Sequence, residues 1–555
     1  MSRPSSALDR RAAFIILAVA IILGTYARFN ILKADFPFND GGMFYVMTLD
    51  LQDNGYRLPA TTTYNFRDIP YAYPPFSFYF TGLASDFTGI SVLELVRILP
   101  ALFNILSIPA TYVLAENFLK SRWAAAVAAL IFALIPNAFD WNVMGGGLTR
   151  SPGNLFAILA VDQAIRMYEK RERRYVATTA ILCALTVLSH AQMAQLALTG
   201  IAMAFLFRGI NRVNIIHSAI VVAGVVVLTF PWWGAMLSMH GLQPLLEAAS
   251  AAPPGLSWED MDFPLSTRLD IFIGEIMRYT NVIPILGMVK LLFDLRWMIP
   301  AWFLANIMIA PRAATSRAGV IVSIAAAVAI GEIIVPLIVL GWHRLTRPRE
   351  TVATMEPVEE AAPASPRLPG WLKPALVIGV GLVLSVLVIL APRNYPALPT
   401  GYRYYTLSPA SRQAMEWISQ YTLPTCRFVT VGANGTIWGR DAIQEWFPVL
   451  AKRLNVTTVQ GTEWLTNPGI EQLQGWRAGM NRCGQGDESC LAEWQRITRQ
   501  PFTHVFIESP ERLGYDTSRP LRESLRQSPN YSLIYARDGI DIFARRDATC
   551  PATME

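Results

Sequence analysis

Long apolar runs alternate with short polar segments over most of this 555-residue chain. A helix needs roughly 20 mostly apolar residues to cross a bilayer, because each residue adds about 1.5 Å to a hydrocarbon core of about 30 Å. The first run covers residues 12–26, and the others begin near Val92, Trp123, Leu155, Val176, Ala191, Ile215, Val282, Met298, Val320 and Pro374. The pattern therefore predicts a polytopic α-helical membrane protein with about 11 spans.

The polar segments between these runs carry basic residues unevenly. If the N-terminus is cytoplasmic, alternation places the Lys- and Arg-rich loops at 120–122, 170–174 and 208–212 in the cytoplasm, where such residues are in excess. Arg10 and Arg11 precede the first run, and no small-residue cleavage site follows it, which indicates a retained anchor. We predict a multi-pass protein of the cytoplasmic (plasma) membrane with its N-terminus inside.

The same alternation divides the rest of the chain. The outer loops would be residues 31–90, 136–153 and 232–280. The predicted parts are a membrane region (1–341), a disordered cytoplasmic linker (342–372), a last transmembrane helix (373–391) and an extracytoplasmic domain (392–555).

The C-terminal region has short alternating stretches in place of long apolar runs. Helical spacing marks residues 409–422 and the stretch around 491–498. Strands are expected at residues 427–433, 455–460, 503–509, 531–537 and 539–545. This mixture predicts a C-terminal extracytoplasmic α/β domain.

Four of the five cysteines lie in this domain. On the outer side they permit two disulfides, most simply Cys483 with Cys490 and Cys426 with Cys550, and unpaired thiols are the alternative. Cys183 lies within a predicted span and is interpreted as a small apolar residue.

Composition narrows the class of protein. Hydrophobic residues make up 53% of the chain and charged residues 16%, which excludes a purely soluble, disordered or fibrous protein. The net charge is +6, but the basic residues are dispersed between apolar runs and form no continuous basic face. Nucleic acid is therefore not an expected partner.

The first outer loop contains an acidic residue beside two glycines. Asp40 precedes Gly41 and Gly42 in the loop that follows the first span. The glycines would let the backbone turn tightly and approach a ligand, and the carboxylate could act as a general base or a metal ligand. The alternative is that Asp40 caps the helix that follows it.

Aromatic residues crowd the second half of the same loop, around Pro74 and Pro75. Tyr71 and Tyr73 are candidates for contact with a sugar ring. An aromatic belt at the membrane interface is the alternative, because Tyr and Trp are enriched there.

The second outer loop combines Asp140, three glycines at 145–147 and Arg150 at the start of the next span. Amides of a glycine-rich turn at a helix N-terminus, together with an arginine, form a site for an anion such as phosphate. A flexible turn with a snorkelling arginine is the alternative. His190 and Arg312 lie at two further outer turns and could contribute to the same anion site.

This layout resembles the GT-C class of integral-membrane glycosyltransferases, such as protein O-mannosyltransferases and lipid A aminoarabinose transferases. The resemblance covers residues 10–340 and rests on Asp40 in a long first outer loop, Tyr73 followed by two prolines, and Asp140 in the second outer loop. Enzymes of this class take a sugar from a polyprenyl-phosphate-type carrier and invert its anomeric centre.

The resemblance implies roles for particular residues. Asp40 would be the catalytic base or a metal-linked acid, and Asp140 its partner carboxylate, so a divalent metal ion at these two acids is the implied cofactor. Arg150 and Arg312 would bind the donor phosphate. O-mannosyltransferases have an Asp-Glu pair in this loop, whereas this chain has Asn39 before Asp40.

We therefore predict an inverting glycosyltransferase that moves a sugar from a polyprenyl-phosphate-type donor to a glycan, lipid or protein acceptor on the outer face of the membrane. The alternatives are a transporter or flippase of lipid-linked saccharide and a non-catalytic envelope-assembly protein. In the outer domain, the candidates for an acceptor-binding surface are Glu445, Trp446, Glu463 and Trp464, and tryptophans buried in a small core are the alternative.

Overall fold

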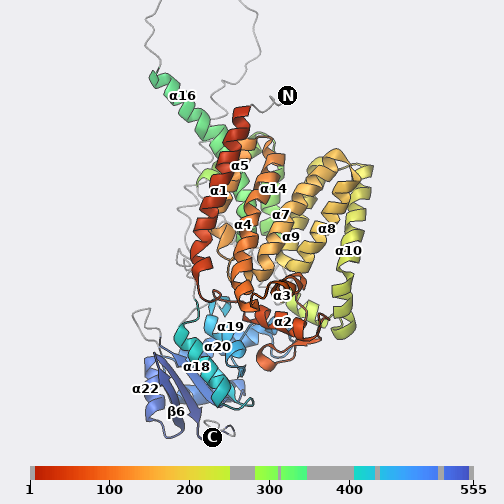
Figure 1. Ribbon diagram of the computed structural model, residues 1–555. Helices are drawn as coiled ribbons and strands as arrows, with labels where there is room; N and C mark the ends of the chain where they lie inside the picture. The colour runs from red at the N-terminus through yellow and green to blue at the C-terminus, as the bar shows by residue number, and fades with distance from the viewer. Residues whose placement is uncertain are drawn as a thin grey trace, which may run out of the picture.

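The computed structural model describes residues 7–250, 282–309, 314–346, 406–431, 438–509, 518–548 and 550. Within these ranges the chain forms an elongated bundle of helices with a smaller α/β domain at one end (Figure 1). Arg312, most of the predicted linker and the predicted last transmembrane helix lie outside the described residues.

The bundle helices follow the apolar runs of the sequence. Their bounds are α1 Ala7–Lys33, α4 Val92–Leu119, α5 Arg122–Leu134, α7 Gly147–Lys170, α8 Arg173–Ser189, α9 Ala191–Arg208, α10 Arg212–His240, α13 Val282–Phe293, α14 Met298–Ile309, α15 Ala314–Ala329 and α16 Val335–Thr346. Among the described residues, five helices are long and apolar enough to cross a membrane, and three shorter helices are also apolar. The chain is therefore a multi-pass membrane protein.

Small residues bring these helices into close contact. Ala125 and Ala129 of α5 are fully buried, and a Cβ placed on Gly24 of α1 would lie 3.0 Å from the Cβ of Ala133. Close backbone approach of this kind is typical of helix packing in membranes.

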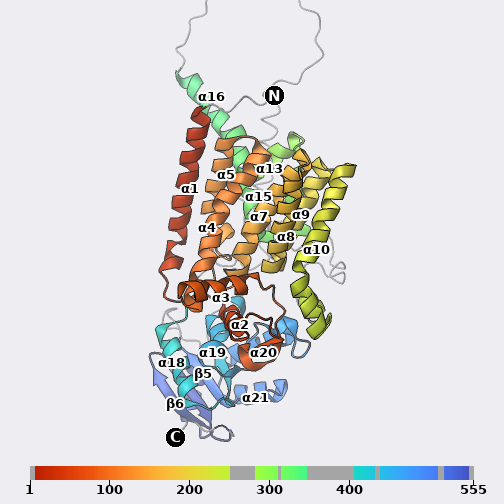
Figure 2. The ribbon, with the colours of Figure 1, turned by 45° about the vertical axis from the view of Figure 1, so that its right-hand side comes forward.

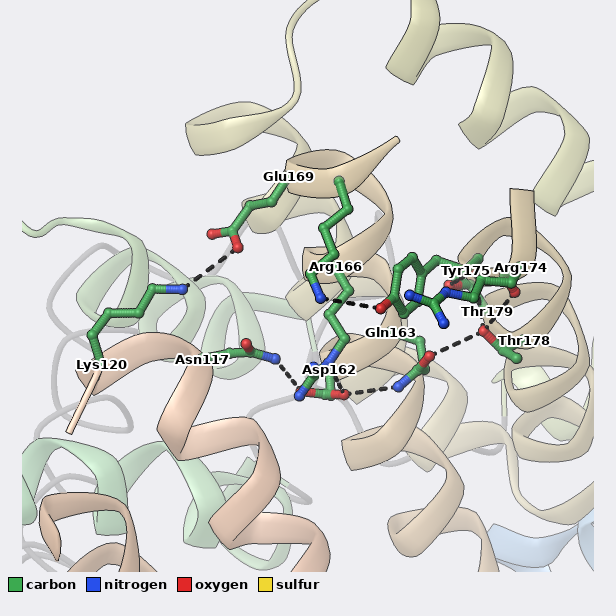
Figure 3. A network of polar contacts seen from close by, with 11 residues as sticks. Asn117, Lys120, Asp162, Gln163, Arg166, Glu169, Arg174, Tyr175, Thr178 and Thr179 are labelled. Carbon is green, nitrogen blue, oxygen red and sulfur yellow. Dashed lines mark hydrogen bonds and ion pairs between the residues drawn. The ribbon is translucent and has the colours of Figure 1, made fainter. Parts of the chain in front are cut away.

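The two ends of the bundle differ in chemistry. At the end far from the C-terminal domain, Lys120 and Arg208 form ion pairs with Glu169. Figure 3 shows the network beside them, in which the buried Asp162 carboxylate accepts hydrogen bonds from Gln163 and Arg166, both at 2.9 Å. The described parts of the predicted outer loops share the opposite end with the C-terminal domain (Figure 2). The side of the membrane that each end faces stays a prediction.

The first of these loops folds into a small layer between the bundle and the C-terminal domain (Figures 1 and 2). It contains α2 (Gly42–Asp53), a hairpin of β1 (Thr61–Thr62) and β2 (Ile69–Pro70), and α3 (Phe76–Thr88). Apolar side chains of this layer, the first turns of α4 and Leu148 at the start of α7 form one buried cluster. The layer thus has a core of its own, which makes it a firm support for the residues on its surface.

The C-terminal domain has a five-stranded mixed sheet with strand order β4-β3-β5-β7-β6. Its strands are β3 Arg427–Val431, β4 Leu454–Asn455, β5 His504–Glu508, β6 Tyr531–Arg537 and β7 Ile540–Arg545. Its helices are α18 Pro409–Tyr421, α19 Ala442–Leu450, α20 Ile470–Cys483, α21 Glu488–Thr498 and α22 Arg519–Gln527. Strand β3 is parallel to β4 and β5, and β7 is antiparallel to β5 and β6.

Alternation along the strands separates two cores. Phe428 and Phe506 pack with α18 and α19 on one face, whereas Val429 and Val505 pack with α20, α21 and α22 on the other. Successive side chains of a strand point to opposite faces, so a sheet covered on both sides needs apolar residues at consecutive positions. The predicted α/β domain is confirmed in the described residues.

The strand expected at 455–460 is wrong beyond its first residue, because β4 ends at Asn455. The Asn455 side chain accepts hydrogen bonds from the backbone N–H of Thr457 at 3.1 Å and from its hydroxyl at 2.9 Å. An Asn side chain that bonds its own backbone two residues on favours a turn over a strand, and the β-branched residues that follow are buried in that turn.

Both predicted disulfides are confirmed. Cys426 pairs with Cys550, and Cys483 pairs with Cys490. Cys183 is a free, partly buried thiol in α8. The first bridge ties the end of the chain to the start of β3, and the second closes the loop between α20 and α21.

Candidate active site

Two glycine-containing turns meet at the end of the bundle that faces the C-terminal domain. The backbone of Asn39 has φ 54° and that of Gly41 has φ 113°, so the chain reverses sharply around Asp40. The N–H of Gly145 donates to the carbonyl of Phe38 at 3.1 Å. A Cβ on Gly145 would lie 1.8 Å from the Asp40 carbonyl oxygen. Glycine at 145 is therefore required for this approach.

This approach places Asp40 against the start of α7. The Asp40 carboxylate accepts a hydrogen bond from the Gly146 N–H at 2.7 Å and one from an Arg150 terminal nitrogen at 2.8 Å. The side chains are mostly shielded from solvent, with exposed fractions of 14% for Asp40 and 6% for Arg150. A charge-assisted pair with so little solvent around it is stronger than the same pair on an open surface.

Arg150 is held from two further directions. Its Nε donates to the Gly146 carbonyl at 3.1 Å, and its guanidinium lies 4.5 Å from the centre of the Trp141 ring. Stacking on an aromatic face fixes the plane of an arginine while its remaining N–H groups can bind an anion. Within the described residues, the hydrogen bonds of Arg150 use Nε and one terminal nitrogen.

The helix-cap interpretation of Asp40 is wrong. Helix α2 has Gly41 at its N-cap, and no side chain of that residue caps it. Instead, Oε1 of Glu445, from α19 of the C-terminal domain, accepts hydrogen bonds from the N–H groups of Gly41 at 3.2 Å and Met43 at 3.0 Å. At the glycine turn, the Gly146 N–H, one of the amides expected to bind phosphate, donates to the Asp40 carboxylate.

Burial of two acids around this turn changes their ionisation. Desolvation, together with the nearby Asp40 carboxylate, raises the pKa of Glu445 to about 8. Desolvation also raises the pKa of Glu463, to about 7. With raised pKa values, these two acids are ionised less near neutral pH than ordinary glutamates, which reduces the negative charge facing Asp40.

The aromatic candidates separate into two roles. Tyr71 is fully buried, and its hydroxyl donates to the Met47 carbonyl at 2.7 Å, so its predicted contact with a sugar does not fit its position. Tyr73 lies closer to the charged groups, and the charges of Glu463, Arg150 and Asp40 all act on it. Desolvation raises the pKa of Tyr73, so its hydroxyl remains a hydrogen-bond donor.

His190 caps the start of α9, as a lone histidine usually does at such a turn. Its Nδ1 accepts from the Gln192 N–H at 3.3 Å. It is nevertheless close to the site, because its ring centre lies 6.3 Å from that of Tyr73 and the charges of Arg150 and Arg317 both act on it. Arg317, in α15, is almost fully buried and donates to the Gln195 side chain at 2.5 Å.

Asp140 is buried at the C-terminal end of the short helix α6 (Pro136–Phe139), and Trp141, whose ring supports Arg150, follows it in sequence. A divalent metal ion at Asp40 and Asp140 stays a prediction, and a cation at Asp40 would share that carboxylate with Arg150. In the described part of the chain, the only group of three potential metal ligands is Cys426, His504 and Cys550, and its two sulfurs form a disulfide.

Sequence reasoning missed the groups that the C-terminal domain brings to the first loop. The Tyr64 hydroxyl donates to the Glu445 carbonyl at 2.8 Å, and the Trp446 indole donates to the Asn39 carbonyl at 3.2 Å. Trp446 is fully buried, which confirms the core interpretation of this tryptophan. The only signal in the sequence was that an acid precedes a tryptophan at Glu445–Trp446 and at Glu463–Trp464. This signal does not indicate that the partners lie in the first loop.

Comparison with known proteins places this site in context. Residues 72–233 match the family model for dolichyl-phosphate-mannose-protein mannosyltransferases. No curated protein sequence matches the chain. The archaeal oligosaccharyltransferase AglB from Archaeoglobus fulgidus, solved with an inhibitory peptide and a dolichol-phosphate, is similar with a TM-score of 0.51 and 12% identity, over 98% of this chain and 75% of AglB.

Two further structures are similar over nearly the whole chain. ArnT from Cupriavidus metallidurans, bound to undecaprenyl phosphate, has a TM-score of 0.48 and 14% identity over 96% of this chain and 97% of ArnT. The mycobacterial arabinofuranosyltransferase AftD has a TM-score of 0.47 and 16% identity over 98% of this chain and 40% of AftD. The fold and the family match confirm the resemblance to GT-C membrane glycosyltransferases.

The contact between the two turns leads to a first prediction. Gly145→Ala would put a methyl group against the Asp40 carbonyl, so we expect the turns to separate, the protein to lose about 1–3 kcal/mol of stability and turnover to fall. Gly475→Ala in α20 is the matched control, because a Cβ there meets nothing within 4 Å. Thermal unfolding in detergent and turnover measure the difference, and equal behaviour of the two variants would contradict the proposed contact.

Proposed function

We propose that this protein is an inverting glycosyltransferase that moves a sugar from a polyprenyl-phosphate-type donor to an acceptor hydroxyl on the outer face of the membrane. The observation that carries the proposal is the shielded pair of Asp40, in the first predicted outer loop, and Arg150, at the start of α7. It joins a candidate proton acceptor to a candidate phosphate ligand. The family match to enzymes that use dolichyl-phosphate-mannose supports a lipid-phosphate donor.

In the proposed reaction, the acceptor oxygen attacks the anomeric carbon and its proton passes to the Asp40 carboxylate. The bond from the anomeric carbon to the phosphate oxygen breaks, and the phosphate leaves with the electron pair. Each carboxylate oxygen has two lone pairs, so Asp40 can accept the acceptor hydroxyl while it remains bonded to Gly146 and Arg150. Attack from the side opposite the leaving phosphate inverts the anomeric centre.

The leaving phosphate needs positive charge and not a proton. Arg150 can offer its remaining N–H groups while the Trp141 ring keeps its plane fixed. His190 lies nearby and is the second proposed donor ligand. The proposed role of Arg312 concerns a residue outside the described part of the chain. No step requires a metal ion at Asp40.

The direct test uses the full chain in proteoliposomes with synthetic polyprenyl-phosphate sugars and a panel of hydroxyl acceptors. We expect release of polyprenyl phosphate coupled to a product whose anomeric configuration, read by NMR, is opposite to that of the donor. A product with retained configuration would overturn the direct displacement. Movement of intact donor across the bilayer without sugar transfer would favour the flippase alternative.

The proposed outer location of the site makes a separate prediction. In a Cys183→Ser background, a membrane-impermeant maleimide applied to intact cells should label Glu416→Cys in α18 and should not label Arg173→Cys at the start of α8. Both positions are exposed, and they lie at opposite ends of the molecule. The reverse labelling pattern would place the site in the cytoplasm and contradict the proposed direction.

A further inference from the structure

We propose that Glu445 of the C-terminal domain is a positioning residue for Asp40. Through Oε1, Glu445 binds the backbone on both sides of Gly42 and thereby holds the turn that presents the Asp40 carboxylate to Arg150. This inference rests on the proposed function for the role of Asp40. It makes the C-terminal domain a structural half of the active site, although Glu445 and Gly41 are 404 residues apart in the chain.

The turn around Asp40 is tightly packed on two sides. On the bundle side, a Cβ on Gly41 would lie 2.8 Å from the Gly145 Cα. On the other side, a Cβ on Gly42 would lie 2.7 Å from the Glu445 carbonyl oxygen. The backbone at Asp40 is thus enclosed between α7 and α19, and a shift of α19 changes where the Asp40 carboxylate lies.

Glu445 also replaces a cap that α2 lacks. The first N–H groups of a helix have no partner within the helix, and an acceptor at this end is favoured by the helix dipole. Glu445 supplies that acceptor from another domain, and it is itself only 5% exposed. Two further bonds hold α19 in this position, from Tyr64 to the Glu445 carbonyl and from Trp446 to the Asn39 carbonyl.

The geometry distinguishes positioning from direct catalysis. Both N–H groups converge on a single oxygen, Oε1, and the carbonyl oxygen of a glutamine can accept the same two bonds. A positioning role therefore requires an acceptor at this place and not a negative charge. A role as a proton acceptor or a cation ligand would require the carboxylate itself.

The experiment compares Glu445→Gln, Glu445→Asp and Glu445→Ala in the full chain, with Glu416→Ala in α18 as the exposed acidic control. We expect Glu445→Gln to keep at least half of the wild-type kcat. Glu445→Ala, and Glu445→Asp with its shorter reach, should lower kcat at least tenfold while the donor Kd changes less than threefold. Hydrogen exchange of the peptide covering residues 39–46 should become faster in the Ala and Asp variants only.

The exchange measurement separates failure of this inference from failure of the proposed function, since it needs no turnover. Unchanged exchange in both Glu445→Ala and Glu445→Asp would overturn the positioning role. Equal loss of kcat in Glu445→Gln and Glu445→Ala would also overturn the positioning role. In that case the reaction would require the carboxyl group of Glu445 itself, and not only a hydrogen-bond acceptor at this place. Faster exchange in Glu445→Ala and Glu445→Asp, together with full activity of Asp40→Asn, would support the positioning role of Glu445 and overturn the catalytic role of Asp40.

Discussion

Asp40→Asn should lower kcat by about 10²–10⁴-fold, the range that a positioned general base contributes, while the donor Kd changes less than threefold. Asparagine can still accept the Gly146 N–H through its single carbonyl oxygen, but it cannot take a proton from the acceptor hydroxyl. The measurement is single-turnover sugar transfer in proteoliposomes, with donor binding followed separately by equilibrium titration.

Asp53→Asn is the control for this variant. It makes the same chemical change at the end of α2, where the side chain is exposed. We expect it to have wild-type turnover and the same thermal unfolding as Asp40→Asn. Turnover of Asp40→Asn within threefold of the wild type would contradict base catalysis by this residue, and the flippase and assembly alternatives would then account better for the chain.

Arg150→Met should have the second large effect, with a different signature. Loss of one preorganised group that stabilises developing charge costs about 10²–10³-fold in kcat, and here we also expect weaker donor binding because the proposed role of the guanidinium is to bind the leaving phosphate. Arg150→Lys should retain part of the turnover and part of the donor affinity, because lysine keeps the charge but cannot reproduce the flat stacking on Trp141. Donor titration and single-turnover rates check both parts.

The control for Arg150→Met is Arg97→Met in α4, which breaks an ion pair with Glu94 instead of the pair with Asp40. We expect this control to leave donor binding unchanged. The double variant Asp40→Asn, Arg150→Met should be less impaired than the product of the two single effects, because the residues contact each other and act on one reaction step. Independent effects would indicate that the pair seen in the structure is not the functional unit.

The role of Glu445 changes how the C-terminal domain is understood. Glu445, Trp446, Glu463 and Trp464 of this domain were expected to form an acceptor surface, but Glu445 and Trp446 contact the loop between α1 and α4 instead. Glu463 and Tyr73 lie on the neighbouring part of the same boundary. The C-terminal domain therefore contributes groups to the boundary beside Asp40, and under the proposed function an acceptor at Asp40 would meet groups from both domains.

Elements whose cause is local were predictable. The described bundle helices follow from apolar run length, the strands β3, β5, β6 and β7 from short apolar stretches, and the bridge between Cys483 and Cys490 from a separation of seven residues. The two-residue β4 was predicted too long, because β-branched residues favour a strand only when no side chain offers the backbone another partner. Asn455 offers one.

The identity of Asp40, Arg150 and the glycine turn as candidates could be read from the chain, since each lies at the boundary between an apolar run and an outer loop. Their mutual arrangement could not. Asp40 pairs with an arginine 110 residues away in the chain, and the acceptor at the start of α2 comes from 402 residues away. Periodicity describes neighbours within one element, whereas contacts between loops depend on how whole elements pack, so these partners are visible in the folded chain and nowhere in the local pattern.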